Sequence, residues 1–148
     1  MSCHCDKSLL YKIKNIIHLR RQLISIQEKE FIEAMFLLES LLENNETPSP
    51  MALFQIGQIE NVLKTLVKYK RDHESHSKYI IFDCKKCQRR FRQTMFSQKL
   101  DLYNLCSKIV SEYEELILEF FAKYQTEILR EKRNTYFKLK FELVKYCI

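Results

Sequence analysis

The sequence predicts an all-helical protein, and its composition carries that prediction. Its 148 residues include one glycine and two prolines, while 46% are hydrophobic and 30% are charged. Sandwiches and barrels need turn glycines at regular intervals, and doubly wound folds need them where a strand enters a helix. Gly57 alone cannot form a phosphate-binding loop or a dinucleotide fingerprint. We therefore expect an all-α fold, a compact four- to five-helix bundle followed by a long C-terminal helical arm.

The first two helices are expected on either side of a short connection. Ser8 is a plausible N-cap, and an isoleucine-rich stripe at helical spacing predicts a helix from Ser8 to Gln22. The stripe blurs at residues 24–26, where β-branched residues intrude, so we place a connection there. A second helix starts near Gln27, with acidic first turns and an apolar face. The clearest loop is 44–50, which contains both prolines.

Two further helices complete the predicted bundle. The apolar spacing after the proline loop predicts a third helix from Met51 to Lys70. The polar stretch from Asp72 to Ser77 is interpreted as a break. A fourth helix is expected from Lys78 to Phe96, with aromatic residues among its basic ones.

The chain from Lys99 onward predicts the helical arm. Apolar residues recur there at alternating spacings of three and four, as in a coiled coil: Leu102, Leu105, Ile109, Tyr113, Leu116, Phe120 and Tyr124. The polar residues 130–134 are expected to separate this helix from a last one at 135–146. Such a stripe needs a partner, either the preceding bundle or a second copy of the chain in a homodimer. The expected domains are 1–97 and 98–148.

Positive charge is concentrated in the middle of the chain. The net charge is +6, yet the segment from Lys64 to Lys99 alone carries eleven basic residues against three acidic ones. Its densest part supplies a candidate basic surface, made of Lys85, Lys86, Arg89, Arg90 and Arg92. Such a field attracts nucleic acid or an acidic peptide, and an ordinary solvated helix face is the alternative interpretation.

The sequence indicates a soluble, intracellular protein. No apolar run approaches the roughly 18 residues that cross a bilayer, and residues 1–10 lack the architecture of a signal peptide. We therefore expect no membrane association, and thiols rather than disulfides for the six cysteines. Nuclear localisation follows from the resemblance given below, with the cytoplasm as the alternative.

Cysteines are the strongest candidates for chemistry. A zinc site wants four sulfur or nitrogen ligands from close pairs. Two sets have the right count, either four cysteines or two histidines with two cysteines: Cys3, Cys5, Cys84 and Cys87, or His73, His76, Cys84 and Cys87. Because the intervals differ from those of common zinc fingers, we favour ordinary thiols and expect no metal or other cofactor. The sequence contains no recognisable pairing of a nucleophile with an activating base, so we do not expect an enzyme.

Four segments resemble a known family of helical bundles. They are IKN at 13–15, FIEAMFLLESL at 31–41, VLKTLVKYKRDH at 62–73 and CQRRFRQTMF at 87–96. Their order resembles the integrase-binding domain of lens-epithelium-derived growth factor and hepatoma-derived-growth-factor-related proteins, and more broadly the N-terminal domain of elongation factor TFIIS. The resemblance covers about the first two thirds of the chain.

The resemblance implies a site that captures short acidic and hydrophobic peptides of transcription and chromatin regulators. Tyr69 matches the family's aromatic residue at the end of the third helix, and its basic positions match Lys64, Lys68 and Lys70. The first connection, from Leu19 to Ile26, corresponds to the other half of the pocket rim and includes Ile24. Where the family has a recognition acid in that connection, this chain has Arg20 and Arg21.

The first functional prediction is therefore a nonenzymatic nuclear adaptor that docks peptide motifs. Three alternatives stay open at this point. The alternatives are a nucleic-acid-binding protein that uses the 64–99 surface, a coiled-coil subunit of a larger assembly, and a helical cytokine whose cysteines form disulfides.

Overall fold

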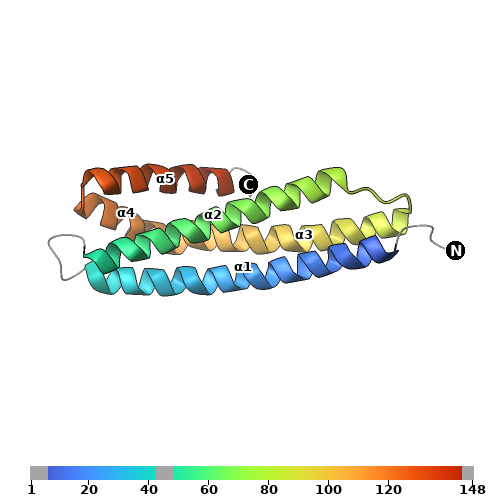
Figure 1. Cartoon of the computed structure of the whole chain (residues 1–148), viewed down its shortest axis with the longest axis horizontal. Coiled ribbons are helices and arrows are strands. Elements are labelled where there is room, and N and C mark those ends of the chain that lie inside the picture. The colour runs from blue at the N-terminus through green and yellow to red at the C-terminus, as the bar shows by residue number, and fades with distance from the viewer. Residues whose placement is uncertain (1–6, 43–48, 145–148) are drawn as a thin grey trace.

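Three long helices lie side by side in the computed structural model, and two shorter helices pack along one end of them (Figure 1). The structure describes residues 7–42 and 49–144, and this part of the chain contains no strand. Its elements are α1 (Lys7–Leu42), α2 (Pro50–Tyr79), α3 (Lys85–Lys108), a π-helical segment η1 (Ile109–Tyr113), α4 (Glu114–Lys123) and α5 (Glu127–Val144). The all-α prediction is confirmed.

The predicted connection at residues 24–26 is wrong, because α1 runs through it without interruption. Ile24 is buried in the core, on the same helix face as Ile17 and Phe31. The spacings of seven residues between these positions keep one stripe on one side of the helix. Burial of that stripe outweighs the small helix cost of the β-branched residues. The first two predicted helices are therefore one helix of 36 residues.

α2 begins with a strong capping signal and ends later than predicted. The Ser49 hydroxyl accepts a hydrogen bond from the backbone N–H of Ala52 at 3.1 Å, and Pro50 occupies the first helical turn. The remaining residues of the predicted proline loop, 44–48, lie outside the described residues. The predicted break from Asp72 to Ser77 is wrong, since α2 continues to Tyr79. Within that stretch His73 is buried, so the polar composition hides a core position.

The connection between α2 and α3 comprises residues 80–84, inside the predicted fourth helix. The backbone N–H of Phe82 donates a hydrogen bond to Gln88 Oε1 at 2.6 Å. The Phe82 ring meets Phe91 edge to face, with 5.6 Å between the ring centroids. These two contacts hold the connection against the first turns of α3. The predicted helix from Lys78 to Phe96 is therefore corrected to one that starts at Lys85.

The predicted C-terminal arm differs from the structure in three places. α3 passes through residues 97 and 98, so the predicted domain boundary falls inside a helix. The π-helical segment η1 then changes the phase of the apolar stripe, which continues on Ile117 rather than on Leu116. The chain next breaks at 124–126, not at 130–134. There Thr126 Oγ1 accepts a hydrogen bond from the N–H of Leu129 at 3.3 Å.

α5 folds back along α2 instead of extending away from the bundle (Figure 1). Lys132 of α5 pairs with Glu60 of α2 at 2.8 Å, and Arg71 pairs with Glu142 further along. The buried stripe residues from Leu102 to Tyr124 belong to one core cluster with residues of α1, α2 and α5. The stripe is thus covered by its own chain. Division into two domains and a homodimer stay predictions.

Two hydrophobic cores, with polar residues between them, fill the bundle. The larger core joins the second half of α1 to α2, α4 and α5. The smaller core joins Ile13 and Ile17 of α1 to Phe82, Cys87, Phe91 and Met95. Between the two cores each long helix contributes a buried polar residue, namely Arg20, His73 and Gln98. We call these three residues the polar layer.

Within residues 7–42 and 49–144, every helix is too short or too polar to span a lipid bilayer.

Candidate functional site

The residues that the resemblance selected are spread over different environments. Leu19 is exposed, while Ile24 is buried in the larger core. Tyr69 is half-buried against that core. Lys64 pairs with Glu60 on its own helix at 3.0 Å, and Lys68 is exposed. Because residues 19–26 are helical, they provide no loop for the rim of a pocket.

Lys70 has a structural role in the C-terminal packing. Its side chain is buried, and Nζ donates to the backbone oxygens of Glu142 and, at 3.0 Å, Leu143. Both carbonyls lie in the last turn of α5, where helical carbonyls lack intrahelical partners and a cation is favourable. Lys70 therefore anchors α5 on α2, a role that the peptide-binding prediction did not include.

The residues of the predicted basic surface divide between two sides of α3. Lys85, Lys86, Arg89, Arg90 and Arg92 are all exposed. Lys85, Arg89 and Arg92 line a concave surface, whereas Lys86 and Arg90 do not belong to its lining. Helical geometry explains the division, because residues three and four apart share a face and immediate neighbours do not.

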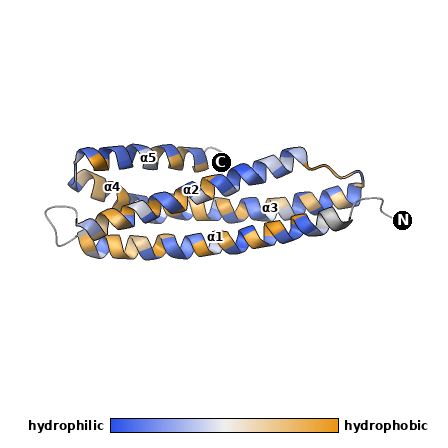
Figure 2. Ribbon diagram, in the orientation of Figure 1, coloured by the Kyte–Doolittle hydropathy of each residue, from blue (hydrophilic) through white to orange (hydrophobic). Residues whose placement is uncertain are grey.

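A groove runs between the end of α2, the 80–84 connection and the first half of α3. We call it the basic groove and define it by six lining residues: Lys78, Ile81, Arg89, Arg92, Phe96 and Lys99. Its central part encloses about 460 Å³, over a floor that includes the buried side chains of Phe91 and Met95. The connection above it is strongly hydrophobic, next to the hydrophilic second half of α2 (Figure 2).

The basic groove combines exposed apolar side chains with cations. Ile81 is 76% exposed and Phe96 is 59% exposed, although both are large hydrophobic residues. Within the described residues, no carboxylate forms an ion pair with Lys78, Arg92 or Lys99. The one acidic residue in the lining of the two groove segments is Asp83, near the mouth. The groove thus offers an apolar floor with a positive rim.

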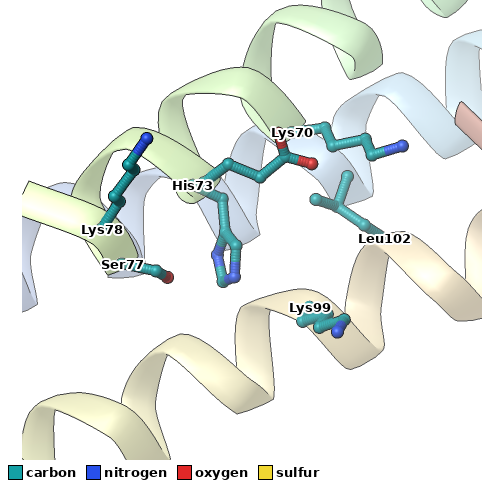
Figure 3. Close-up of a pocket in the computed structure, with 7 residues that line it drawn as sticks. Lys70, His73, Ser77, Lys78, Lys99 and Leu102 are labelled. Atoms are coloured by element: carbon teal, nitrogen blue, oxygen red, sulfur yellow. The ribbon is translucent and has the colours of Figure 1, made fainter. Parts of the chain in front are cut away.

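An inner cavity of about 380 Å³ continues the groove toward the middle of the bundle (Figure 3). Its lining shares Lys78 and Lys99 with the six defining residues of the groove, shares His73 and Ser77 with the rest of the lining of the groove's central part, and adds Lys70, Glu74 and Leu102. In Figure 3 the His73 ring and the Ser77 hydroxyl point from α2 toward α3. The lining of the cavity contains three lysines and one glutamate, but the ammonium group of Lys70 is bound by α5 carbonyls and that of Lys78 lies over the Tyr79 ring.

The polar layer forms the inner boundary of this cavity through His73. His73 is 8% exposed, Arg20 is 9% exposed and Gln98 is fully buried. Nevertheless, Arg20 Nη1, His73 Nδ1 and both amide atoms of Gln98 have no hydrogen-bond partner among the described residues. Buried polar groups are normally paired, and an unpaired one costs free energy. These atoms are sealed from solvent, and of the three residues only His73 lines the cavity, so the layer costs stability unless a ligand shifts the His73 ring.

The surroundings of the layer favour a neutral His73. Burial lowers the pKa of His73, the neighbouring Gln98 amide raises it, and the positive charges of Arg20 and Lys99 lower it further. Burial also lowers the pKa of His76 one turn further along α2, again with a contribution from Arg20. The pKa of Arg20 is itself lowered by burial, which Asp72 opposes. At neutral pH the imidazoles therefore act as hydrogen-bonding groups and not as cations.

The candidate zinc ligands do not come together in the described residues. Cys84 is half-buried at the start of α3 and Cys87 is buried in the smaller core. No group of three or more His, Cys, Asp or Glu side chains able to hold a metal ion occurs in the described ranges. Cys3 and Cys5 lie outside the described residues, so the set of four cysteines stays a prediction.

Comparison with protein-family models, curated proteins and solved structures finds no match to this chain.

Sequence reasoning missed the inner cavity and the polar layer. One signal was present for Arg20, since its spacing from Ile13, Ile17 and Ile24 places it on the buried face of α1. Lys78 and Lys99 were counted only as positive charge. Phe96 was placed at a helix end, although α3 continues past it and exposes its ring.

Proposed function

We propose that this chain is a nonenzymatic docking module that binds short acidic and hydrophobic segments of partner proteins in the basic groove. The observation that carries the proposal is the apolar floor beneath a positive rim. This retains the kind of partner that the sequence suggested and moves the site from the Tyr69 region to the α2–α3 groove. Placement of the protein in nuclear transcription or chromatin complexes rests on the resemblance alone.

The apolar part of the groove supplies affinity. Burying a phenylalanine or leucine side chain is worth about 1.5–3 kcal/mol. The exposed side chains of Ile81 and Phe96 lie beside buried Phe91 and Met95, so an inserted apolar residue is contacted from the rim and from the floor. Large exposed apolar residues gathered at one concavity are characteristic of interaction sites.

The cationic rim supplies selectivity. Each exposed ion pair contributes only about 0.2–1 kcal/mol, which is less than the apolar insertion. Its principal effects are faster association with an acidic segment and rejection of a basic one. Arg89, Arg92, Phe96 and Lys99 follow one another at spacings of three, four and three on one face of α3. A peptide lying along this face would therefore contact the two arginines, then the Phe96 ring, and then Lys99.

Selection from a phage-displayed library of random peptides tests the proposal. We expect the wild-type chain to enrich peptides that combine Asp or Glu with Phe or Leu. The double variant Arg92→Glu, Lys99→Glu should lose this enrichment, since its rim charge is reversed. The matched control, Arg130→Glu with Lys138→Glu, changes the same charges at exposed positions of α5 and should select as the wild type does.

Two outcomes contradict the proposal. Enriched peptides without acidic bias, or equal selection by the rim variant, would show that the groove is not the docking site. Binding of a single-stranded RNA or a DNA duplex in preference to the selected peptides, with steep salt dependence, would assign the rim to nucleic acid.

A further inference from the structure

We propose that the inner cavity is a phosphate site, so that the segment docked in the basic groove carries a phosphorylated side chain. This inference rests on the proposed function and names the chemistry of its partner. Three independent features support it: the donors around the cavity, the orphaned polar layer behind it, and the apolar groove in front of it.

The donors around the cavity match a phosphate better than a carboxylate. Lys78, Lys99, Ser77 and His73 all line it. A phosphomonoester carries about −1.5 to −2 charges at neutral pH and three strong acceptor oxygens. A carboxylate brings one negative charge, which balances only one of the two lysines. Lys70 is set aside here, because its ammonium group is engaged by α5 carbonyls.

The polar layer supplies the buried end of the site. The His73 ring points into the cavity in Figure 3 and is more than nine-tenths buried, yet its Nδ1 has no partner among the described residues. Gln98 lies close enough to that ring to raise the pKa of His73, although neither of its amide atoms makes a well-aligned hydrogen bond. The positive charges of Arg20 and Lys99 act on the same imidazole. A phosphate oxygen that accepts a hydrogen bond from the His73 ring N–H would give this imidazole a partner. The positive charges of Arg20 and Lys99 would attract the phosphate to the same place.

Two acidic residues oppose the anion and set the limits of the site. Glu74 lines the cavity, and Asp72 acts on Arg20. Against them stand Lys99, the guanidinium of Arg20 behind the cavity, and Lys78, whose ammonium group lies 5.4 Å from the Tyr79 ring centroid and must turn inward to reach an anion. The net charge around the cavity remains positive. The carboxylates repel any phosphate that does not reach Lys78 and Lys99.

A phosphorylated side chain of a peptide fits the surroundings better than a nucleic-acid backbone. The cavity is reached through the groove with which it shares His73, Ser77, Lys78 and Lys99. Leu102 and the apolar floor of the groove border the same path. A ligand therefore presents an anion at one end and apolar side chains next to it. A continuous polyanion would place phosphates over Phe91 and Met95 as well.

The first test uses phenyl phosphate as the probe and follows the His73 ring and Ser77 amide signals by NMR. We expect saturable shifts with phenyl phosphate and at least about tenfold weaker binding of benzoate. Lys99→Gln should lose the response, whereas Lys138→Gln, on exposed α5, should retain it. No saturable shift, or an unchanged response in Lys99→Gln, would overturn the site. Helical circular dichroism of each variant verifies folding.

The second test separates this inference from the proposed function. A peptide selected by display is synthesised in pairs, with each serine or threonine present unmodified or phosphorylated. Tighter binding of one phosphorylated form, by about tenfold or more and lost in Lys99→Gln, supports the phosphate site. Equal binding of every pair overturns the phosphate site and leaves the docking function standing. If no peptide binds while phenyl phosphate saturates, the docking function fails and the anion site stands. If RNA displaces phenyl phosphate at a lower concentration than any phosphopeptide does, the peptide assignment is overturned.

Discussion

Replacing Gln98 with leucine should stabilise the protein, because the wild-type side chain buries an amide whose two polar atoms make no well-aligned hydrogen bond. Gln98 is fully buried, and neither its Nε2 nor its Oε1 has a partner among the described residues. Mutational data place the cost of burying an unpaired polar group at about 1–3 kcal/mol. Leucine fills a similar volume without that cost. We therefore expect the free energy of unfolding to rise by about 1–3 kcal/mol.

Chemical denaturation followed by far-ultraviolet circular dichroism measures this change. For a chain of this size each kilocalorie corresponds to about 2–4 °C in Tm, so Tm should rise by about 2–12 °C. The slope of the transition should not change, because the surface exposed on unfolding is the same. Gln93→Leu is the matched control, since Gln93 is exposed on the same helix and carries the same difference in helix propensity. It should stay within about 0.5 kcal/mol of the wild type.

Destabilisation by Gln98→Leu, relative to Gln93→Leu, would refute this reasoning. It would show that the amide is paired in solution, and that the polar layer contributes to stability instead of lowering it. The same result would remove one of the three supports of the phosphate site.

Three further predictions concern pH, packing and assembly. Burial lowers the pKa of His73 and His76, so the unfolded chain binds more protons than the folded one. The free energy of unfolding should therefore fall as the pH drops below about 6.5. The variant His73→Gln should show a weaker dependence on pH. Lys70→Met should cost about 1.5–3 kcal/mol in denaturation by releasing α5, whereas exposed Lys68→Met should cost little. Because the chain covers its own stripe, light scattering coupled to size exclusion should give 18.0 kDa at low and high salt, and twice that mass would instead support the homodimer expected from the sequence.

Composition was sufficient for the fold class, while local signals placed some boundaries and missed others. Scarcity of glycine and the helical spacing of apolar residues led to the all-α prediction. The capping signal at Ser49 and Pro50 appears in the structure as an N-cap. The break at 124–126 has no proline or glycine and is marked only by the threonine cap at Thr126, so the polar run at 130–134 was the stronger local signal.

A core position occupied by a polar residue explains one of the wrong boundaries. Asp72 to Ser77 was interpreted as a break because its composition is polar, yet His73 continues the buried stripe of α2. Arg20 was placed inside the predicted first helix, and the resemblance assigned it to the first connection instead of the core. The site could be predicted only as positive charge, since the groove depends on how α2 and α3 diverge around the 80–84 connection. That divergence results from packing between segments distant in the sequence.

The separation of the two cores also governs how the molecule opens. The smaller core contains six of the described residues, whereas the larger one contains most of the buried side chains. Local unfolding follows such differences, so amide protons near Ile13 and Phe91 should exchange with solvent before those near Leu63. The basic groove lies at this less stable end. A ligand that bridges α2 and α3 there would slow exchange throughout that end, so binding and local order are energetically coupled.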